Sequence, residues 1–222
     1  MSRPWRIVAD DAPHVISIRF DTETDTRHQL NVVGARTRYA DLDCSRRVFT
    51  IGARLRPGAL PTLFGVRADE LTNRSVAAEL LVRGHARRLL AALEMGSLTD
   101  AASHLTSFLA ELTVRRGSLD ARARHVADIG RTDAYTVRDV ATVLGLGERG
   151  LRSWSATHLG LGLRRFIRIR RLHAALERRL ACPTETWSRI AATTGFADQP
   201  HLVRDCRALL GESPGQFFAR AS

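Results

Sequence analysis

The chain of 222 residues can form two small domains, and its hydrophobic content of 44% excludes wholesale disorder. The formal net charge of +11 is unevenly distributed, because residues 114–222 hold 19 arginines against 10 acidic residues. This basic half favours a polyanionic partner such as DNA, whose condensed counterions are released when a protein binds.

The cysteines and the N-terminal segment indicate the cellular compartment of the protein. Cys44, Cys182 and Cys206 show none of the Cys–Cys or Cys–His spacings of a zinc site, as expected for a reduced cytoplasmic protein. The start of the chain, MSRPWRIVADDAPH, lacks the apolar core of a signal peptide, and no run approaches the length of a membrane span. We therefore expect a cytoplasmic protein with no membrane partner.

The N-terminal half begins with a pattern of short strands between residues 14 and 61. VISIRF alternates weakly and is rich in β-branched residues, and the segments NVVGARTRYADL and RRVFTIGARLRP continue the pattern. Gly34, Gly52 and the pair Pro57–Gly58 mark turns and bends. We expect a small antiparallel sheet or a partial barrel.

Two amphipathic helices are expected after the strands, over residues 75–95 and 98–114. Ser75 is predicted to cap the first helix, with Glu79 in its first turn. The predicted inward residues are Ala78, Leu81, Leu89, Leu90 and Leu93 in the first helix and Ala102, Leu105, Phe108, Leu109 and Leu112 in the second. Such helices can pack on the sheet or form a dimer interface, and Arg115–Ser118 is the expected domain boundary.

The N-terminal half shows no spacing typical of a metal site or a catalytic set. Its scattered candidates for metal ligands are His14, His28, Asp41, Asp43 and Cys44, which lack the close His–x–His spacing of a barrel metal site. Asp69 and Glu70 fit a capping role better than a catalytic one. We assign no metal, no cofactor and no catalytic residue, and we predict that the protein is not an enzyme.

The basic half starts with a supporting helix at residues 119–129 and a first helix-turn-helix unit at about residues 136–158. Thr136 is predicted to cap a helix that buries Val140 and Leu144, and Gly145 permits the sharp turn that follows. The next helix begins near Gly147 and would lie in the DNA major groove. The predicted DNA-contacting residues of this unit are Arg149, Arg152 and Ser153, on the outer face of that helix.

A linker helix is predicted over residues 163–181, ended by Pro183. Its apolar stripe consists of Phe166, Ile169, Leu172, Leu176 and Leu180. Its other faces carry Arg164, Arg165, Arg168, Arg170, Arg171, Arg178 and Arg179, some of which we expect to contact phosphates. At about 1.5 Å per residue the helix spans about 28 Å, close to the roughly 34 Å between successive turns of the major groove. It can therefore hold two recognition helices on one face of DNA.

The second unit, at about residues 186–210, has the same organisation. Ala191 and Gly195 are four residues apart, as Ala141 and Gly145 are in the first unit, so the two units form an internal repeat. Asp198 is a good N-cap for the recognition helix of this unit. The predicted DNA-contacting residues are Gln199, Pro200, His201, Val203, Arg204 and Arg207, opposite the inward-facing Leu202, Cys206 and Leu209.

These motifs carry a resemblance to a known family. Residues from about 123 to 221 resemble the DNA-binding domain of AraC/XylS-type transcription regulators, most closely in IAATTGFADQPHLVRDCRALLGESPGQF and in the linker segment FIRIRRLHAALERRL. The resemblance implies an N-terminal cupin-like barrel that senses a ligand or dimerises. The first unit departs from the family pattern, which has Ser or Thr at Gly147, Arg at Ser153, Phe at Ser155 and Pro at Leu163. We expect this unit to bind DNA less tightly or less specifically than the second.

The sequence therefore predicts an α+β protein, with a short N-terminal β-sheet or partial barrel with helices and then an all-α domain with two helix-turn-helix units. The expected domains are residues 1–115, for effector sensing or dimerisation, and residues 119–222, for DNA binding. The predicted function is a sequence-specific transcription regulator, with double-stranded DNA, a small-molecule effector and a second copy of the chain as partners. Two alternatives remain: an enzyme fused to an AraC-type domain, with Cys44 as its N-terminal candidate, and a dimerising DNA-binding protein that senses no effector.

Overall fold

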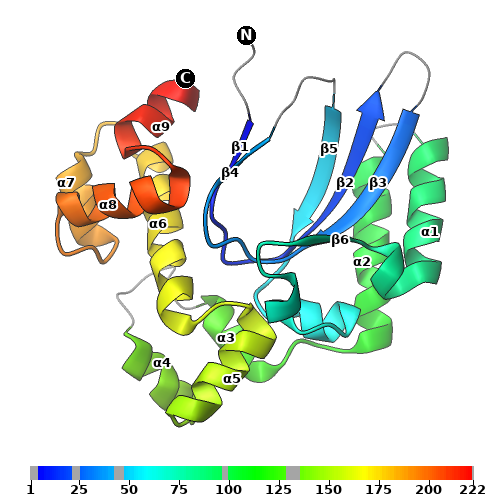
Figure 1. Cartoon of the computed structure of the whole chain (residues 1–222), viewed down its shortest axis with the longest axis horizontal. Coiled ribbons are helices and arrows are strands. Elements are labelled where there is room, and N and C mark those ends of the chain that lie inside the picture. The colour runs from blue at the N-terminus through cyan, green and yellow to red at the C-terminus, as the bar shows by residue number, and fades with distance from the viewer. Residues whose placement is uncertain (1–4, 22–25, 43–47, 97–99, 129–135, 222) are drawn as a thin grey trace.

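The computed structural model describes residues 5–21, 26–42, 48–96, 100–128 and 136–221. An N-terminal part built on a sheet and two helices lies beside a helical C-terminal part (Figure 1). A short two-stranded ribbon lies between them and brings residues near the N-terminus against the last helices of the chain. The predicted α+β class, with the strands in the N-terminal half and helices alone in the C-terminal half, is confirmed.

The main sheet has four antiparallel strands in the order β5-β2-β3-β6. These strands are β2 (His14–Asp21), β3 (Thr26–Val33), β5 (Val48–Arg54) and β6 (Ser75–Ala77), and the ribbon pairs β1 (Trp5–Ile7) with β4 (Ala40–Leu42). Val15 of β2 lies opposite Val32 of β3, and both are fully buried, so two β-branched side chains meet on the covered face. The predicted small antiparallel sheet is therefore present.

The prediction that Ser75 caps a helix is wrong. Ser75 instead begins the edge strand β6, in which Val76 lies opposite Val32. Helix α1 (Glu79–Met95) starts only after Ala78, whose N–H donates to the Leu30 carbonyl at 2.8 Å. The unpaired edge of β3 offers backbone hydrogen bonds that outweigh the local capping signal of the serine.

Helices α1 and α2 (Ala101–Arg116) cover one face of the sheet (Figure 1). The core between them includes Val15, Leu30, Val32, Leu89, Leu93, Leu105, Phe108 and Leu112. A π-helical turn at Leu60–Phe64 and a 3-10 turn at Ala68–Leu71 also bury apolar side chains in this core. Ala102 was predicted to face inward but is exposed, because Ala101, four residues before Leu105, occupies the buried stripe.

The C-terminal part consists of helices only. They are α3 (Ala121–Asp128), α4 (Val137–Leu144), α5 (Glu148–Leu159), α6 (Leu163–Ala181), α7 (Trp187–Thr193), α8 (Gln199–Leu210) and α9 (Pro214–Ala221). Helices α4 and α5 form the first predicted unit, α7 and α8 form the second, and α6 joins them. Ile129, the predicted end of α3, lies outside the described residues. Within the described ranges, no helix combines the length and the hydropathy needed to cross a membrane.

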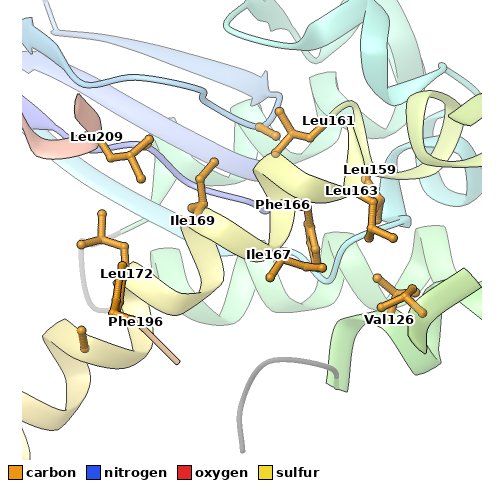
Figure 2. Packing of buried hydrophobic residues seen from close by; sticks show 14 of the residues in the cluster. Val126, Leu159, Leu161, Leu163, Phe166, Ile167, Ile169, Leu172, Phe196 and Leu209 are labelled. Carbon is orange, nitrogen blue, oxygen red and sulfur yellow. The ribbon is translucent and has the colours of Figure 1, made fainter. Parts of the chain in front are cut away.

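Helix α6 is the central element of both units. Phe166, Ile169 and Leu172 have no exposed surface and belong to one buried cluster with residues of both helix-turn-helix units (Figure 2). Leu176 is partly buried, whereas Leu180 is 70% exposed, although both were predicted on the same stripe. The last turn of α6 extends past the core, so the apolar stripe of the sequence is one turn longer than the part of the helix that is buried.

The N-terminal part packs against both helix-turn-helix units. Ala9 belongs to the same buried cluster as α6, and its N–H donates to the Leu209 carbonyl of α8 at 3.2 Å. Near the first unit, the Thr72 hydroxyl donates to the Gly160 carbonyl at 2.6 Å. Gly160 ends α5 with a φ of 71°, and a Cβ there would lie 2.6 Å from the Ala68 carbonyl oxygen. Packing thus crosses the expected boundary near residue 115, which remains a prediction.

A buried ionic cluster joins the two parts at α6. The Asp11 side chain has no exposed surface, and its oxygens lie 2.7 Å from Nη2 of Arg54 and 3.5 Å from Nη1 of Arg170. Burial raises the pKa of Asp11, although both guanidinium groups favour the carboxylate. Burial is also the largest single influence on Asp10, but Arg54, His173 and the Ala12 N–H together outweigh it, and the pKa of Asp10 is lowered.

Asp11→Ala should lower the free energy of unfolding by about 1–3 kcal/mol, because Arg170 loses its buried counter-ion, whereas Arg54 keeps its pair with Asp10. Urea unfolding of the full chain, followed by circular dichroism, measures this loss. Asp69→Ala is the matched control, since Asp69 pairs with the exposed Arg67 at 2.7 Å and its removal should change little. Equal losses in the two variants would contradict the role assigned to Asp11.

Candidate nucleic-acid interface

The first unit begins with a complete capping box on α4. The Thr136 hydroxyl accepts a hydrogen bond from the Asp139 N–H at 3.2 Å, and the Asp139 carboxylate accepts one from the Thr136 N–H at 2.7 Å. Hydrogen bonds from the Thr136 side chain and backbone lower the pKa of Asp139. Gly145 ends the helix with a φ of 62°, so the predicted cap and turn are both confirmed.

Helix α5 follows this turn and presents the predicted contact residues of the first unit. Gly147 precedes the helix and has no side chain to cap it, while Leu151 and Trp154 are buried. The exposed residues of its outer face include Arg149, Arg152 and Ser153. Arg152 donates to the Glu148 carboxylate one turn earlier at 3.1 Å. To bind a phosphate, Arg152 must therefore first break its surface ion pair with Glu148.

Ser155 is buried in α5 at a position where the resemblance implies Phe. It is 1% exposed, and its hydroxyl has no hydrogen-bond partner among the residues that the structure describes. The neighbouring Trp154 stacks on His158 with ring centroids 5.1 Å apart. Burial lowers the pKa of His158, which favours its neutral form.

The recognition helix of the second unit begins with a side-chain cap, which α5 lacks. Asp198 accepts a hydrogen bond from the His201 N–H at 2.6 Å and so caps α8, as predicted. Gly195 makes the preceding turn with a φ of 80°, and Phe196 is buried beside it. The His201 ring packs edge-on against Phe196 with centroids 5.3 Å apart, which explains why this predicted contact residue is half-buried.

The outer face of α8 is formed by the residues predicted to contact DNA. Gln199, Pro200, Arg204 and Arg207 are exposed, while His201 and Val203 are half-buried. The Ser188 hydroxyl of α7 donates to the side-chain oxygen of Gln199 at 2.7 Å. This bond orients the amide and leaves its nitrogen available as a donor, so one helix offers both an amide and guanidinium groups to a partner.

An acidic residue inside the basic unit ties α8 to the linker. Asp205 is 5% exposed, and its carboxylate lies 2.8 Å from Nη2 of Arg168 on α6. This pair was not predicted from the sequence, although Asp205 lies three residues after Leu202 and four before Leu209, on the inward stripe. Burial raises the pKa of the adjacent Cys206 to about 12, so its thiol acts as a small apolar side chain.

Most arginines of the linker bind other parts of the protein. Arg168, Arg170, Arg178 and Arg179 each interact with a carboxylate or a carbonyl group. Arg178 donates to the Glu185 carboxylate at 2.6 Å, and this hydrogen bond holds the pKa of the Glu185 carboxyl below its ordinary value. Arg164 and Arg165, in the first turn of α6, are exposed and form no ion pair within the described ranges. These two therefore remain the best linker candidates for phosphate contacts.

One cluster brings three potential metal ligands together. Carboxylate oxygens of Asp10 and Asp11 and a ring nitrogen of His173 lie within 4.8 Å of one another. Arg54 and Arg170 interact with the same carboxylates, so guanidinium groups already supply the positive charge that a cation would bring. We interpret the cluster as an ion-pair network between the two parts of the chain.

Three of the ligand candidates named from the sequence lie in the described part of the chain, and each has other contacts: His14, His28 and Asp41. Asp41 pairs with Arg6 at 2.6 Å, and His14 lies 3.4 Å from an Asp10 oxygen. Burial lowers the pKa of His14 against the attraction of Asp10. Asp43 and Cys44 lie outside the described residues.

Two parts of the chain match known family models. Residues 140–220 match a model described as a helix-turn-helix domain, and residues 2–77 match one described as a domain of unknown function (DUF6597). None of the curated protein sequences compared matches the chain significantly.

The fold is similar to that of solved structures of ToxT from Vibrio cholerae. An apo variant from strain SCE256 aligns over 100% of this chain and 95% of its own, with 11% identity and a TM-score of 0.53. ToxT from strain O395 bound to (E)-4-(8-methylnaphthalen-1-yl)but-3-enoic acid aligns over 100% and 97%, with 11% identity and a TM-score of 0.53. Wild-type ToxT with a bound unsaturated fatty acid aligns over 98% and 91%, with 11% identity and a TM-score of 0.51.

Two turns with positive φ, two recognition helices and one linker define the C-terminal part as a double helix-turn-helix DNA-binding domain. This domain is of AraC type, and the chain is a DNA-binding transcription regulator.

Asp198→Ala should lower the free energy of unfolding by about 0.5–2 kcal/mol, because it removes the side-chain cap of α8. Gly147→Ser should instead raise it by a few tenths of a kcal/mol, roughly, since a hydroxyl can cap α5 and the new Cβ meets no atom within 4 Å. Urea unfolding of both variants measures the difference. A loss in both variants would show that the two recognition helices do not differ in capping as described.

Proposed function

We propose that the protein binds two adjacent segments of the DNA major groove, one with α5 and one with α8. The observation that carries the proposal is α6, a helix of 19 residues whose buried stripe packs on both units. Its length of about 28 Å approaches the roughly 34 Å repeat of the major groove. A rigid connection of this length supports simultaneous binding of both recognition helices on one face of the duplex.

Helix α8 supplies most of the sequence reading in this proposal. Its start is capped, and it exposes Gln199 and Arg204, whose side chains suit adenine and guanine edges. Helix α5 starts without a cap, and its Arg152 is paired with Glu148. These differences support a positioning role for α5, mainly through phosphate contacts.

Residues 1–115 act, in the same proposal, as a non-catalytic part that binds a small effector or joins two copies of the chain. The fold shared with ToxT, which binds an unsaturated fatty acid in one solved structure, supports the effector role. The direct contacts of Ala9 with α8 and of Thr72 with the end of α5 give such an effector a path to both units. The protein would act in the cytoplasm.

Gln199→Ala should relax the preference at one or two base positions, because a good side-chain pair discriminates between bases by about 1–3 kcal/mol. Selection of bound sequences from a random DNA pool, followed by competition gel shifts, measures the preference. Gln29→Ala, which changes an exposed residue of the sheet, should leave the profile intact. An unchanged profile for Gln199→Ala would contradict the reading role of α8. Failure of the unaltered chain to select any sequence would overturn the proposed function itself.

Arg149→Ala and Arg152→Ala should each weaken binding to all sequences and reduce the salt slope by about one counterion per lost phosphate contact. Gel shifts at several salt concentrations give the slope. Arg83→Ala, on the exposed side of α1, is the matched control for the loss of one positive charge. If either α5 variant changes the preferred sequence at a constant salt slope, α5 reads bases and the positioning role is wrong.

A further inference from the structure

Two arginines of the N-terminal part lie beside the first helix-turn-helix unit. Arg38 follows Thr37 and Arg74 follows Asn73, and these two preceding residues line a groove of about 590 Å³, the Asn73 groove, between the N-terminal part and the first unit. Both arginines are exposed, and neither forms an ion pair among the residues that the structure describes. No acidic residue stands within two positions of either one in the sequence. Their charges are therefore available to a partner in solution.

Hydrogen bonds join the two loops that carry these arginines. Asn73 has a φ of 59°, the only positive φ of a non-glycine residue in the described ranges. Its side-chain oxygen accepts a hydrogen bond from the Thr37 N–H at 2.8 Å, and the Gly34 N–H donates to the Arg74 carbonyl at 3.1 Å. Arg38 and Arg74 are thus held on one joined pair of loops, although they are far apart in the sequence.

The opposite wall of the Asn73 groove carries arginines of the DNA-binding domain. Arg152 of α5 and Arg164 and Arg165 in the first turn of α6 line it, and all three are exposed. Glu148 is the one acidic residue among the described residues that line the groove, and it pairs with Arg152 at 3.1 Å. The first turn of α6 holds no acidic residue. Arginines of both parts of the chain therefore border one groove, with little negative charge between them.

We propose that the N-terminal part contacts the DNA backbone through Arg38 and Arg74, next to the phosphates that Arg164 and Arg165 contact. The inference rests on the proposed function, because it needs α5 to lie in the major groove. It extends that function, since the DNA-binding surface would then include both parts of the chain. It also gives residues 1–115 a role besides effector binding or dimerisation.

The spacing of charge on DNA supports this contact. Each strand of a duplex carries a phosphate about every 3.4 Å along the axis, so a strand that contacts Arg164 and Arg165 presents further phosphates on either side. The wall next to Arg38 and Arg74 faces those two residues across a groove of small-molecule size, so guanidinium groups on long side chains can meet the neighbouring phosphates. Since Arg38 and Arg74 continue a DNA-binding surface, duplex DNA fits them better than an anionic membrane does.

The departures of the first unit from the family pattern favour a second source of phosphate contacts. Ser153 stands where the resemblance implies Arg, and Arg152 is paired with Glu148. Where the N-terminal part meets the second unit, its Arg6 is already paired with Asp41 at 2.6 Å. Phosphate contacts from the N-terminal part beside the first unit would offset the arginine that this unit lacks, without adding base specificity.

Gel shifts at several salt concentrations test the contact on a DNA sequence that the unaltered chain selects. Arg38→Gln and Arg74→Gln should each reduce the salt slope by about 0.9 and weaken binding roughly five- to tenfold at about 0.1 M salt. Arg83→Gln removes the same charge from the exposed side of α1 and should leave both values unchanged. The midpoint of urea unfolding should stay the same, because neither Arg38 nor Arg74 forms an ion pair within the described ranges. Unchanged slopes in both groove variants would overturn the proposal.

Phosphate ethylation interference locates the contacted phosphates. The double variant Arg38→Gln/Arg74→Gln should lose interference only at phosphates next to the half-site bound by α5, while the base preference of the chain stays the same. Arg165→Gln should lose interference at phosphates adjacent to these. Loss at the half-site bound by α8 instead, or an altered base preference in the double variant, would overturn the proposal.

These measurements separate the inference from the proposed function. If the unaltered chain selects no DNA sequence, the proposed function is wrong and the inference falls with it. If the chain selects a sequence but the double variant binds it with the same slope and the same phosphates, the inference alone is wrong. Vesicles of phosphatidylglycerol provide the remaining comparison. If the double variant loses vesicle binding and keeps its DNA binding, the two arginines serve a membrane and the DNA contact is overturned.

Discussion

The packing of helix α6 is the constraint on which the rest of the structure depends. Phe166, Ile169 and Leu172 are fully buried, and the cluster around them contains residues of both helix-turn-helix units and of the N-terminal segment. Each unit is too small to bury a core of its own, so both use the same face of one helix. The separation of α5 and α8 is therefore set by a hydrophobic core. A substitution in that core would alter how the two recognition helices are spaced on DNA, although no DNA-contacting residue is changed.

Sequence reasoning located the elements whose signals are local. The capping residues Thr136 and Asp198, the turn glycines and the bounds of α6 depend on neighbours a few residues away, and they agree with the prediction. Strand β6 could not be found in this way, because Ser75 joins β3 through backbone bonds to residues far along the chain. For Leu180 the sequence pattern predicted burial, but the side chain is exposed, because the last turn of α6 extends past the core.

The exposed residues of the candidate interface could be predicted from the sequence, but the ion pairs between distant residues could not. The exposed faces of α5 and α8 follow from helical periodicity, which needs no tertiary information. Asp11 and Asp205 form their ion pairs with arginines distant in sequence, and no spacing rule could pair them. These pairs remove two linker arginines, Arg168 and Arg170, from the set that could bind phosphate. The number of arginines on α6 therefore overstates how many can contact DNA. Two departures of the first unit from the family pattern have a structural counterpart: Gly147 leaves the start of α5 without a side-chain cap, and Ser155 is buried in the same helix.

Gly160 limits how the two parts of this protein can be recombined. The glycine ends α5, and its carbonyl accepts the Thr72 hydroxyl, while a Cβ at this position would meet the Ala68 carbonyl oxygen. A chimaera that joins this C-terminal half to the sensor of another regulator must therefore supply a hydroxyl that donates to the Gly160 carbonyl. Its sensor must also pack closely against the backbone of Gly160. Grafting at a linker chosen from sequence alone would break that contact without any visible mismatch in the alignment. The transferable unit is consequently larger than the DNA-binding domain and includes the turn at Ala68–Leu71.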